Sequence, residues 1–258
     1  MPLPELDLTG QRAVVIGGTS GIGLALALGL ARAGADVAVA GRRLPQAQAA
    51  AEQIRRLGSR GLAIAADVTD RASLAALAAQ AEADFGAVEI LVNCAGRTRR
   101  APTLDFPAEE WQAILDTNLT GAFLASQIFG RAMLARGYGR IINIASLTSF
   151  VAMYEVAAYA ASKAALASLT QSLAVEWARR GVCVNAIAPG VFRTDLNQKL
   201  LDGTARGQEL LLRTPMGRFG QVEELVGAAV FLASRAAAFV TGQILAVDGG
   251  FLASGVNQ

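Results

Sequence analysis

The sequence contains no histidine and only two cysteines among its 258 residues. Without histidine, the chain cannot build a Ser-His-Asp triad, a Cys-His pair or a histidine-ligated metal site. We therefore predict no metal, and any acid–base chemistry has to use tyrosine, lysine, cysteine or carboxylates. Cys94 and Cys183 lie in apolar, strand-like contexts, which is typical of buried free thiols rather than of a disulfide.

Neither sign of charge is in large excess, because 23 Lys and Arg stand against 21 Asp and Glu. A net charge of +2 argues against a surface for nucleic acid or an anionic membrane. No apolar run is long enough to span a bilayer, and residues 1–7 lack the basic and apolar regions of a signal peptide. We expect a cytoplasmic protein with a small-molecule substrate and no nucleic-acid or membrane partner.

Apolar strand-like runs alternate with helix-like segments along the whole chain, and 53% of the residues are hydrophobic. Strands are predicted at 13–16, 37–40, 62–65, 90–92, 141–144, 182–187 and 244–247, and helices at 22–33, 44–57, 73–85, 108–136, 156–180 and 222–232. This alternation predicts a parallel sheet covered by helices on both faces. With no repeat or linker, residues 1–258 are predicted to form one domain. The irregular segment 191–214 is too long for an ordinary connection, which indicates a substrate loop.

A glycine-rich turn, Gly17-Gly-Thr-Ser-Gly-Ile-Gly23, joins the first strand to the first helix. Its spacing is G-x-x-x-G-x-G rather than the usual G-x-G-x-x-G. Glycines let the backbone approach a pyrophosphate, and the helix N-terminus offers free N–H groups to an anion. The turn predicts a dinucleotide site. The expected contacts are Gly17, Thr19, Ser20, Gly21, Ile22 and Gly23.

The end of the second strand carries information about which dinucleotide binds. An acidic residue about 20 positions after the turn would bind the ribose hydroxyls of NAD. Arg42 and Arg43 stand there instead, and an arginine suits a 2′-phosphate. A solvated basic pair at a helix start is the alternative. NADP(H) is therefore favoured, and NAD(H) remains possible.

Tyr159 and Lys163 are four residues apart in a predicted helix, so they share one face. A free phenol has a pKa of about 10, which a neighbouring cation lowers. Such a pair can therefore serve in acid–base catalysis. Most Tyr–Lys pairs at this spacing have no such role. Ser146, at the end of the preceding strand, and the glycine turn give this pair its weight.

Together these residues resemble the short-chain dehydrogenase/reductase family over essentially the whole chain. The resemblance implies an α/β fold, a single-domain, Rossmann-like, doubly wound, seven-stranded parallel sheet, and a homotetramer built on the two long helices. It implies four catalytic residues, namely Asn118, Ser146, Tyr159 and Lys163. The further cofactor contacts that it implies are Asp67, Val68, Asn93, Ala95, Gly96, Tyr159, Lys163, Pro189, Gly190, Val191 and Thr194. Two residues depart from the family pattern, Ile16 in place of threonine and Cys94 in place of asparagine.

The roles of the four catalytic residues also follow from the resemblance. Tyr159 would exchange a proton with the substrate oxygen, and Ser146 would hold that oxygen by a hydrogen bond. Lys163 would lower the pKa of Tyr159 and bind the nicotinamide ribose. Asn118 would hold a water that links Lys163 to solvent. Taken singly, Ser146 could equally cap a strand end, and Asn118 could be the N-cap of a restarting helix.

The substrate is less determined by the sequence. Residues 93–100, 141–150 and 247–258 resemble the sugar-acid oxidoreductases of this family, the gluconate and deoxygluconate dehydrogenases. Arg99 and Arg100 follow the fourth strand at the carboxyl end of the sheet, where such sheets bind ligands. An arginine there can bind a carboxylate through two hydrogen bonds. We therefore expect Arg99, Arg100 and Ser146 to contact a sugar acid or polyol. A solvated or subunit-contact arginine pair is the alternative.

Two other functions stay open. A 3-oxoacyl-carrier-protein reductase would share all four catalytic residues. Many such reductases have an arginine at the position of Val175, whereas Arg131 and Arg136 remain available here for an acidic carrier protein. The second alternative is a non-catalytic nucleotide-binding sensor of the same fold, which the presence of Tyr159 and Lys163 disfavours.

Overall fold

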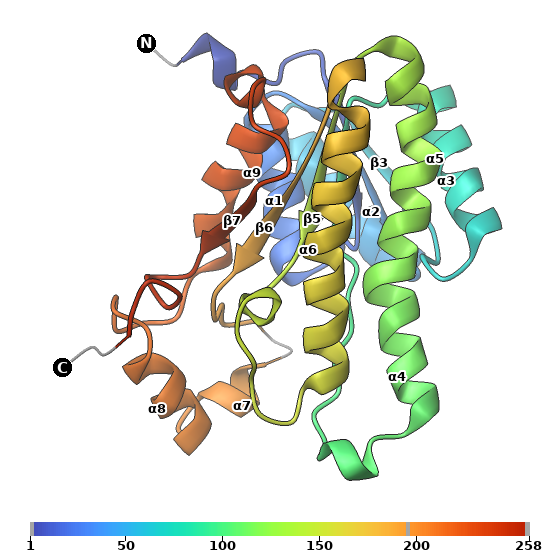
Figure 1. The fold of residues 1–258 in the computed structure, drawn as a ribbon. Coiled ribbons are helices and arrows are strands. Elements are labelled where there is room, and N and C mark those ends of the chain that lie inside the picture. Colours follow the sequence, from blue (N-terminus) through green and yellow to red (C-terminus); the bar gives the residue numbers. More distant parts are fainter. Residues whose placement is uncertain (1–2, 195–196, 256–258) are drawn as a thin grey trace.

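The computed structural model describes residues 3–194 and 197–255. Seven strands form one parallel sheet in the order β3-β2-β1-β4-β5-β6-β7 (Figure 1). The strands are β1 (Arg12–Ile16), β2 (Asp36–Gly41), β3 (Gly61–Ala65), β4 (Ile90–Asn93), β5 (Gly139–Ile144), β6 (Val182–Pro189) and β7 (Ile244–Val247). The predicted seven-stranded parallel sheet is confirmed, and each predicted strand is present, with ends that differ by at most two residues.

Helices cover both faces of this sheet. They are α1 (Gly21–Arg32), α2 (Leu44–Arg56), α3 (Arg71–Phe85), α4 (Ala108–Leu115), α5 (Gly121–Arg136), α6 (Ala157–Trp177), α7 (Gln198–Leu201), α8 (Ala205–Leu212) and α9 (Val226–Ala233). Neighbouring strand residues point to opposite faces. Val15 lies in the core shared with α1, α2 and α9, whereas Val14 and Ile16 lie in the core shared with α3, α5 and α6. The alternation of apolar runs is thus explained by a sheet buried on both sides.

Two predicted segments differ in detail. Residues 108–136 are not one bent helix, because a π-helical turn, Asp116–Thr120, lies between α4 and α5. Asn118 lies inside this turn and is therefore not the N-cap of a restarting helix. Segment 191–214 is not wholly irregular, since it contains α7 and α8, which Leu201 and Gly207 anchor by their burial.

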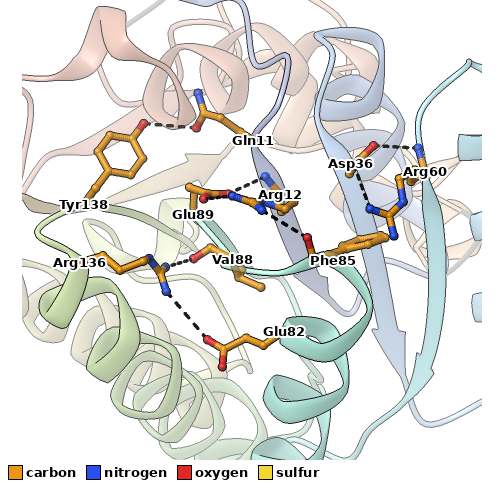
Figure 2. A network of polar contacts seen from close by, with 10 residues as sticks. All are labelled: Gln11, Arg12, Asp36, Arg60, Glu82, Phe85, Val88, Glu89, Arg136 and Tyr138. Atoms are coloured by element: carbon orange, nitrogen blue, oxygen red, sulfur yellow. Dashed lines mark hydrogen bonds and ion pairs between the residues drawn. The ribbon is translucent and has the colours of Figure 1, made fainter.

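The amino ends of the strands are tied together by polar contacts (Figure 2). Arg12 of β1 donates three hydrogen bonds to Glu89, one from its backbone N–H and two from its guanidinium, with Nε 3.0 Å from Oε2. Its Nη1 donates to the Phe85 carbonyl. Arg136 at the end of α5 donates to the Val88 carbonyl. This edge is occupied by structural contacts. The strand arrowheads in Figure 1 point to the opposite, carboxyl edge, where α7, α8 and the start of α6 lie.

Candidate active site

The glycine turn leaves β1 next to the exit of β4, where successive crossovers run to opposite sides of the sheet. Gly17 has φ +83°, and a Cβ on it would lie 2.6 Å from the Ala95 nitrogen. A Cβ on Gly23 would lie 2.1 Å from the Gly17 carbonyl oxygen. Gly17 therefore lets the turn lie against the segment after β4, and Gly23 lets the start of α1 pack on the turn itself.

The N-terminus of α1 has the features of an anion site. Ser20 is the N-cap, yet its side chain makes no capping hydrogen bond. The first backbone bond of the helix runs from the Leu24 N–H to the Ser20 carbonyl, so the preceding N–H groups lack a partner within the helix. These groups and the helix dipole favour a phosphate. Thr194, after β6, lies beside this turn, with its Cγ2 3.7 Å from a Cβ built on Gly21.

The residues expected on the adenosine side gather at the ends of β2 and β3. Arg42 and Arg43 are both exposed. Hydrogen bonds from Thr69 lower the pKa of Asp67, and the positive charge of nearby Arg42 contributes to the same effect. Val68 packs against Gly121, where a Cβ would lie 2.9 Å from the Val68 Cβ. Arg42 and Asp67, which are 25 positions apart in the chain, thus face the same region.

Asn93, at the end of β4, joins the sheet to the helices that cover it. Its Nδ2 donates to Asn143 Oδ1 at 2.9 Å and to Ser126 Oγ at 3.1 Å. Asn143 in turn donates to Thr170 Oγ1 at 2.9 Å. This buried chain of hydrogen bonds joins β4 and β5 to α5 and α6. Sequence reasoning missed Ser126, Asn143 and Thr170, although an asparagine inside the apolar run Ile141–Ile144 was a signal of a buried polar contact.

Ser146, Tyr159 and Lys163 lie together at the carboxyl edge. Ser146 follows β5, and its hydroxyl accepts a hydrogen bond from the Thr148 N–H at 3.2 Å and is hydrogen-bonded to Tyr159. Ser146 therefore both caps the short turn after β5 and contacts the tyrosine. Lys163 is only 4% exposed, and its Nζ donates to the Ile144 carbonyl at 2.6 Å. The same Nζ is 5.6 Å from the centre of the Tyr159 ring.

The pKa shifts of Tyr159 and Lys163 are governed by burial. Burial raises the pKa of Tyr159, although the hydrogen bond with Ser146 lowers it, and Cys94 adds to the rise. Burial lowers the pKa of Lys163 to about 8 and raises that of the Cys94 thiol to about 11. The pKa of Tyr159 is thus raised overall, opposite to the expected lowering, because the cost of burying the charged phenolate outweighs the other effects. In this structure the Lys163 ammonium is bound to the Ile144 carbonyl and lies by the Tyr159 ring.

Asn118 stands in the π-helical turn with its side chain fully engaged. Its Oδ1 accepts from the Arg97 N–H at 2.8 Å, and its Nδ2 donates to the Arg97 carbonyl and to Ser162 Oγ, each at 3.0 Å. Ser162, also missed by sequence reasoning, is fully buried. A Cβ on Gly96 would lie 3.5 Å from Asn118 Oδ1 and 3.9 Å from Lys163 Nζ. The loop after β4 is thereby held beside the lysine.

The two arginines expected to contact substrate are paired with carboxylates. Arg99 Nη1 lies 3.9 Å from Glu110, which also contacts Arg97 at 2.6 Å. Arg100 Nε lies 2.7 Å from Glu155, immediately before α6. Both arginines remain about half exposed and lie on the loop that Asn118 holds. These ion pairs hold both arginines on the loop after β4, and Arg100 is not an isolated cation because Glu155 is its partner.

Pro189 is the last residue of β6, and Gly190 and Val191 follow it on the same edge. Gly190 packs closely on Asp248, where a Cβ would lie 2.6 Å from its Cα. A cavity of about 150 Å³ opens between Gly190, Val191 and the segment after α8, with Thr214 and Met216 in its wall. The catalytic group does not line this cavity. Among the described residues there is no cluster of three potential metal ligands.

Residues 16–252 match a protein-family model described as enoyl-(acyl carrier protein) reductase. The chain is 43% identical to gluconate 5-dehydrogenase of Gluconobacter oxydans, over 98% of this chain and 100% of that protein. It is 43% identical to D-threitol dehydrogenase of Mycolicibacterium smegmatis, over 96% and 95% respectively. A gluconate 5-dehydrogenase of Burkholderia cenocepacia, solved with NADP and tartrate, shares 45% identity with a TM-score of 0.94, over 97% of this chain and 98% of that one.

The chain belongs to the short-chain dehydrogenase/reductase family. It is a nicotinamide-dependent oxidoreductase that interconverts a CH–OH group and a carbonyl of a small polar molecule. The resemblance on which the sequence analysis relied is confirmed. Within the part of the chain that the structure describes, no helix is long and apolar enough to cross a membrane.

Proposed function

We propose that the protein is an NADP(H)-dependent dehydrogenase of a sugar acid or related polyol, acting in the cytoplasm as a homotetramer. The observation that carries the proposal is the meeting of Ser146, Tyr159 and Lys163 at the carboxyl edge, beside a glycine turn shaped for a pyrophosphate. Relatives named as gluconate 5-dehydrogenases support the substrate class. The acyl-carrier alternative is not favoured, because these full-length relatives act on sugar acids by name.

Each residue of the candidate site would have a separate role in the reaction. The bound nicotinamide supplies or accepts the hydride. Tyr159 gives a proton to the substrate oxygen in reduction and removes it in oxidation, while Ser146 holds the same oxygen. Lys163, with a pKa of about 8, can exchange a proton near neutral pH. Both N–H groups of the Asn118 side-chain amide donate to the protein, one to the Arg97 carbonyl and one to Ser162 Oγ. A relay water at Asn118 would therefore have to donate its hydrogen bond to a carbonyl oxygen.

Exposed apolar side chains on the helices support the homotetramer. Val175 on α6 is 83% exposed, and Phe123 on α5 and Trp111 on α4 are partly exposed. Exposed apolar side chains on neighbouring helices can mark a subunit contact. The two long helices α5 and α6 are therefore proposed as the subunit contact. Sedimentation of the purified protein measures the number of subunits directly.

Arg42→Ala is expected to weaken NADPH binding by about ten- to a hundredfold and to leave NADH binding nearly unchanged. The basis is that one charge-assisted hydrogen bond contributes roughly 1.5–3 kcal/mol. Titration of both coenzymes by tryptophan fluorescence or calorimetry measures the effect. Arg43→Ala shows whether the second arginine shares the role, and Arg71→Ala, at an exposed site on α3, is the control. Equal affinities of the wild type for NADPH and NADH would exclude the coenzyme assignment.

Arg99→Ala is expected to lower kcat/KM for gluconate by about ten- to a hundredfold, mainly through KM. The reason is that Arg99 shares its carboxylate with Arg97 at a long 3.9 Å, so its guanidinium keeps donors for a substrate carboxylate. The same change should barely affect an uncharged sugar alcohol. Arg131→Ala on α5 is the control. If neither Arg99→Ala nor Arg100→Ala distinguishes charged from neutral substrates, these arginines do not anchor the substrate.

A further inference from the structure

Glu155 joins two segments of the entrance. Its carboxylate Oε2 lies 2.7 Å from Arg100 Nε. Its backbone carbonyl accepts a hydrogen bond from the Ala101 N–H at 3.1 Å. The loop after β4 is thereby fastened to the residue that precedes Val156, the N-cap of α6. Glu155 thus lies four residues before Tyr159, just outside the N-terminus of α6.

The backbone of Glu155 is unusual. Its φ is +64°, and within residues 3–194 and 197–255 it is the one non-glycine residue with positive φ. A residue with a Cβ adopts this conformation only at a cost, whereas glycine adopts it freely. A glutamate in a position that suits glycine indicates that its side chain is used. That side chain is 20% exposed, and Arg100 accounts for only one of its two oxygens.

A third segment meets the first two at this place. Arg206 of α8 extends its Nη1 to 3.4 Å from the Tyr154 carbonyl oxygen. Among described residues, Arg206 has no carboxylate partner. The helix of the proposed substrate loop thus reaches the residue next to Glu155. Glu155 therefore lies where the loop after β4, the segment before α6 and the helix α8 meet.

We propose that Glu155 is a specificity-determining residue that sets the charge preference of the substrate site. Its carboxylate pairs with Arg100 at 2.7 Å, so Arg99, which lies 3.9 Å from Glu110, is the one of these two arginines that keeps donors for a substrate carboxylate. Its free oxygen Oε1 can accept a hydrogen bond from a substrate hydroxyl. The site therefore combines one anion-binding arginine with a carboxylate that favours polyols and limits the attraction of acids. This inference rests on the proposed function, and it narrows the substrate to polyhydroxy compounds that bind through both charge and hydroxyl contacts.

Glu155→Gln tests the inference through a ratio of two substrates. Gluconate and D-glucitol differ only in having a carboxylate or a hydroxymethyl group at one end. Removing the Glu155 charge should raise kcat/KM for gluconate relative to glucitol by about tenfold, mainly through a lower KM, as expected for unit charges several Å apart near a protein surface. If either compound is turned over too slowly to follow, its Ki as a competitive inhibitor replaces KM in the ratio.

Matched variants separate this effect from others. Glu109→Gln removes an exposed charge of α4 that has no ion pair among the described residues, and it should leave the ratio unchanged. Glu155→Gly fits the backbone conformation, so it provides a folded variant if Glu155→Gln is unstable, and it should shift the ratio in the same direction. An unchanged ratio, or an equal loss for both compounds, would overturn the role of Glu155. A wild type that neither turns over nor binds either compound would instead overturn the proposed function.

Discussion

Tyr159→Phe should reduce turnover by roughly a hundred- to ten-thousandfold, the range that a positioned acid or base contributes. The change keeps the ring and removes only the hydroxyl that Ser146 contacts. Coenzyme binding should persist, because the glycine turn and the N-terminus of α1 are untouched. Steady-state kinetics with gluconate, together with a coenzyme titration of the same sample, measures the two properties separately.

A second tyrosine provides the control for this experiment. Tyr138 lies at the amino edge of the sheet, where its hydroxyl donates to Gln11 Oε1 at 3.2 Å. Tyr138→Phe should lose about 1 kcal/mol of stability, as for one hydrogen bond, and keep normal turnover. Near-normal turnover of Tyr159→Phe would refute the acid–base role of Tyr159 and leave the family assignment standing.

Lys163→Met should abolish turnover and weaken coenzyme binding, yet make the folded protein more stable at neutral pH. Lys163 is almost fully buried, and burial lowers its pKa from 10.5 to about 8. That difference corresponds to roughly 3 kcal/mol of unfavourable free energy for burying the charged form. The variant also loses the hydrogen bond to the Ile144 carbonyl, which lowers its stability by about 1 kcal/mol. The free energy of unfolding is therefore expected to rise by about 2 kcal/mol in total.

The stability difference between the wild type and Lys163→Met should depend on pH, and this dependence is the internal control of the prediction. The unfolded chain binds more protons than the folded chain between pH 8 and 10.5, so this lysine makes wild-type stability rise with pH across that range. Below pH 8 the full penalty is present, and above pH 10.5 it is absent. Denaturant unfolding of the wild type and Lys163→Met at pH 7, 9 and 10.5 should therefore show a difference that shrinks as pH rises. A variant less stable than the wild type at pH 7 would contradict the assigned burial penalty.

The gain in stability and the loss of turnover would have one cause. A buried ammonium with a pKa near 8 is unfavourable for folding, and the same burial places its proton exchange close to neutral pH. Active sites commonly keep such groups at the expense of stability. Finding both effects in Lys163→Met would support a functional role for this lysine more strongly than lost activity alone.

The sequence by itself determined the sheet and much of the candidate site. Strand-forming runs and helical segments are local patterns, so the succession of β1, the glycine turn and α1 can be recognised from the sequence alone. Ser146, Tyr159 and Lys163 were found because two of them are four residues apart and the third ends the preceding strand. Parallel strands bring their carboxyl ends to one edge, so the grouping followed from the topology.

Only the tertiary structure decided the interactions between these groups. Arg100 and Glu155 are 55 positions apart, and Asn93 and Asn143 are 50 apart, so no local pattern shows that each pair is in contact. The direction of the Lys163 ammonium, toward the Ile144 carbonyl, depends on how α6 packs on the sheet. Charge pairing and burial set the pKa of each group, and both are properties of the packed chain. The sequence thus determined which residues meet at the edge, and the fold decided what each one does to its neighbours' charge.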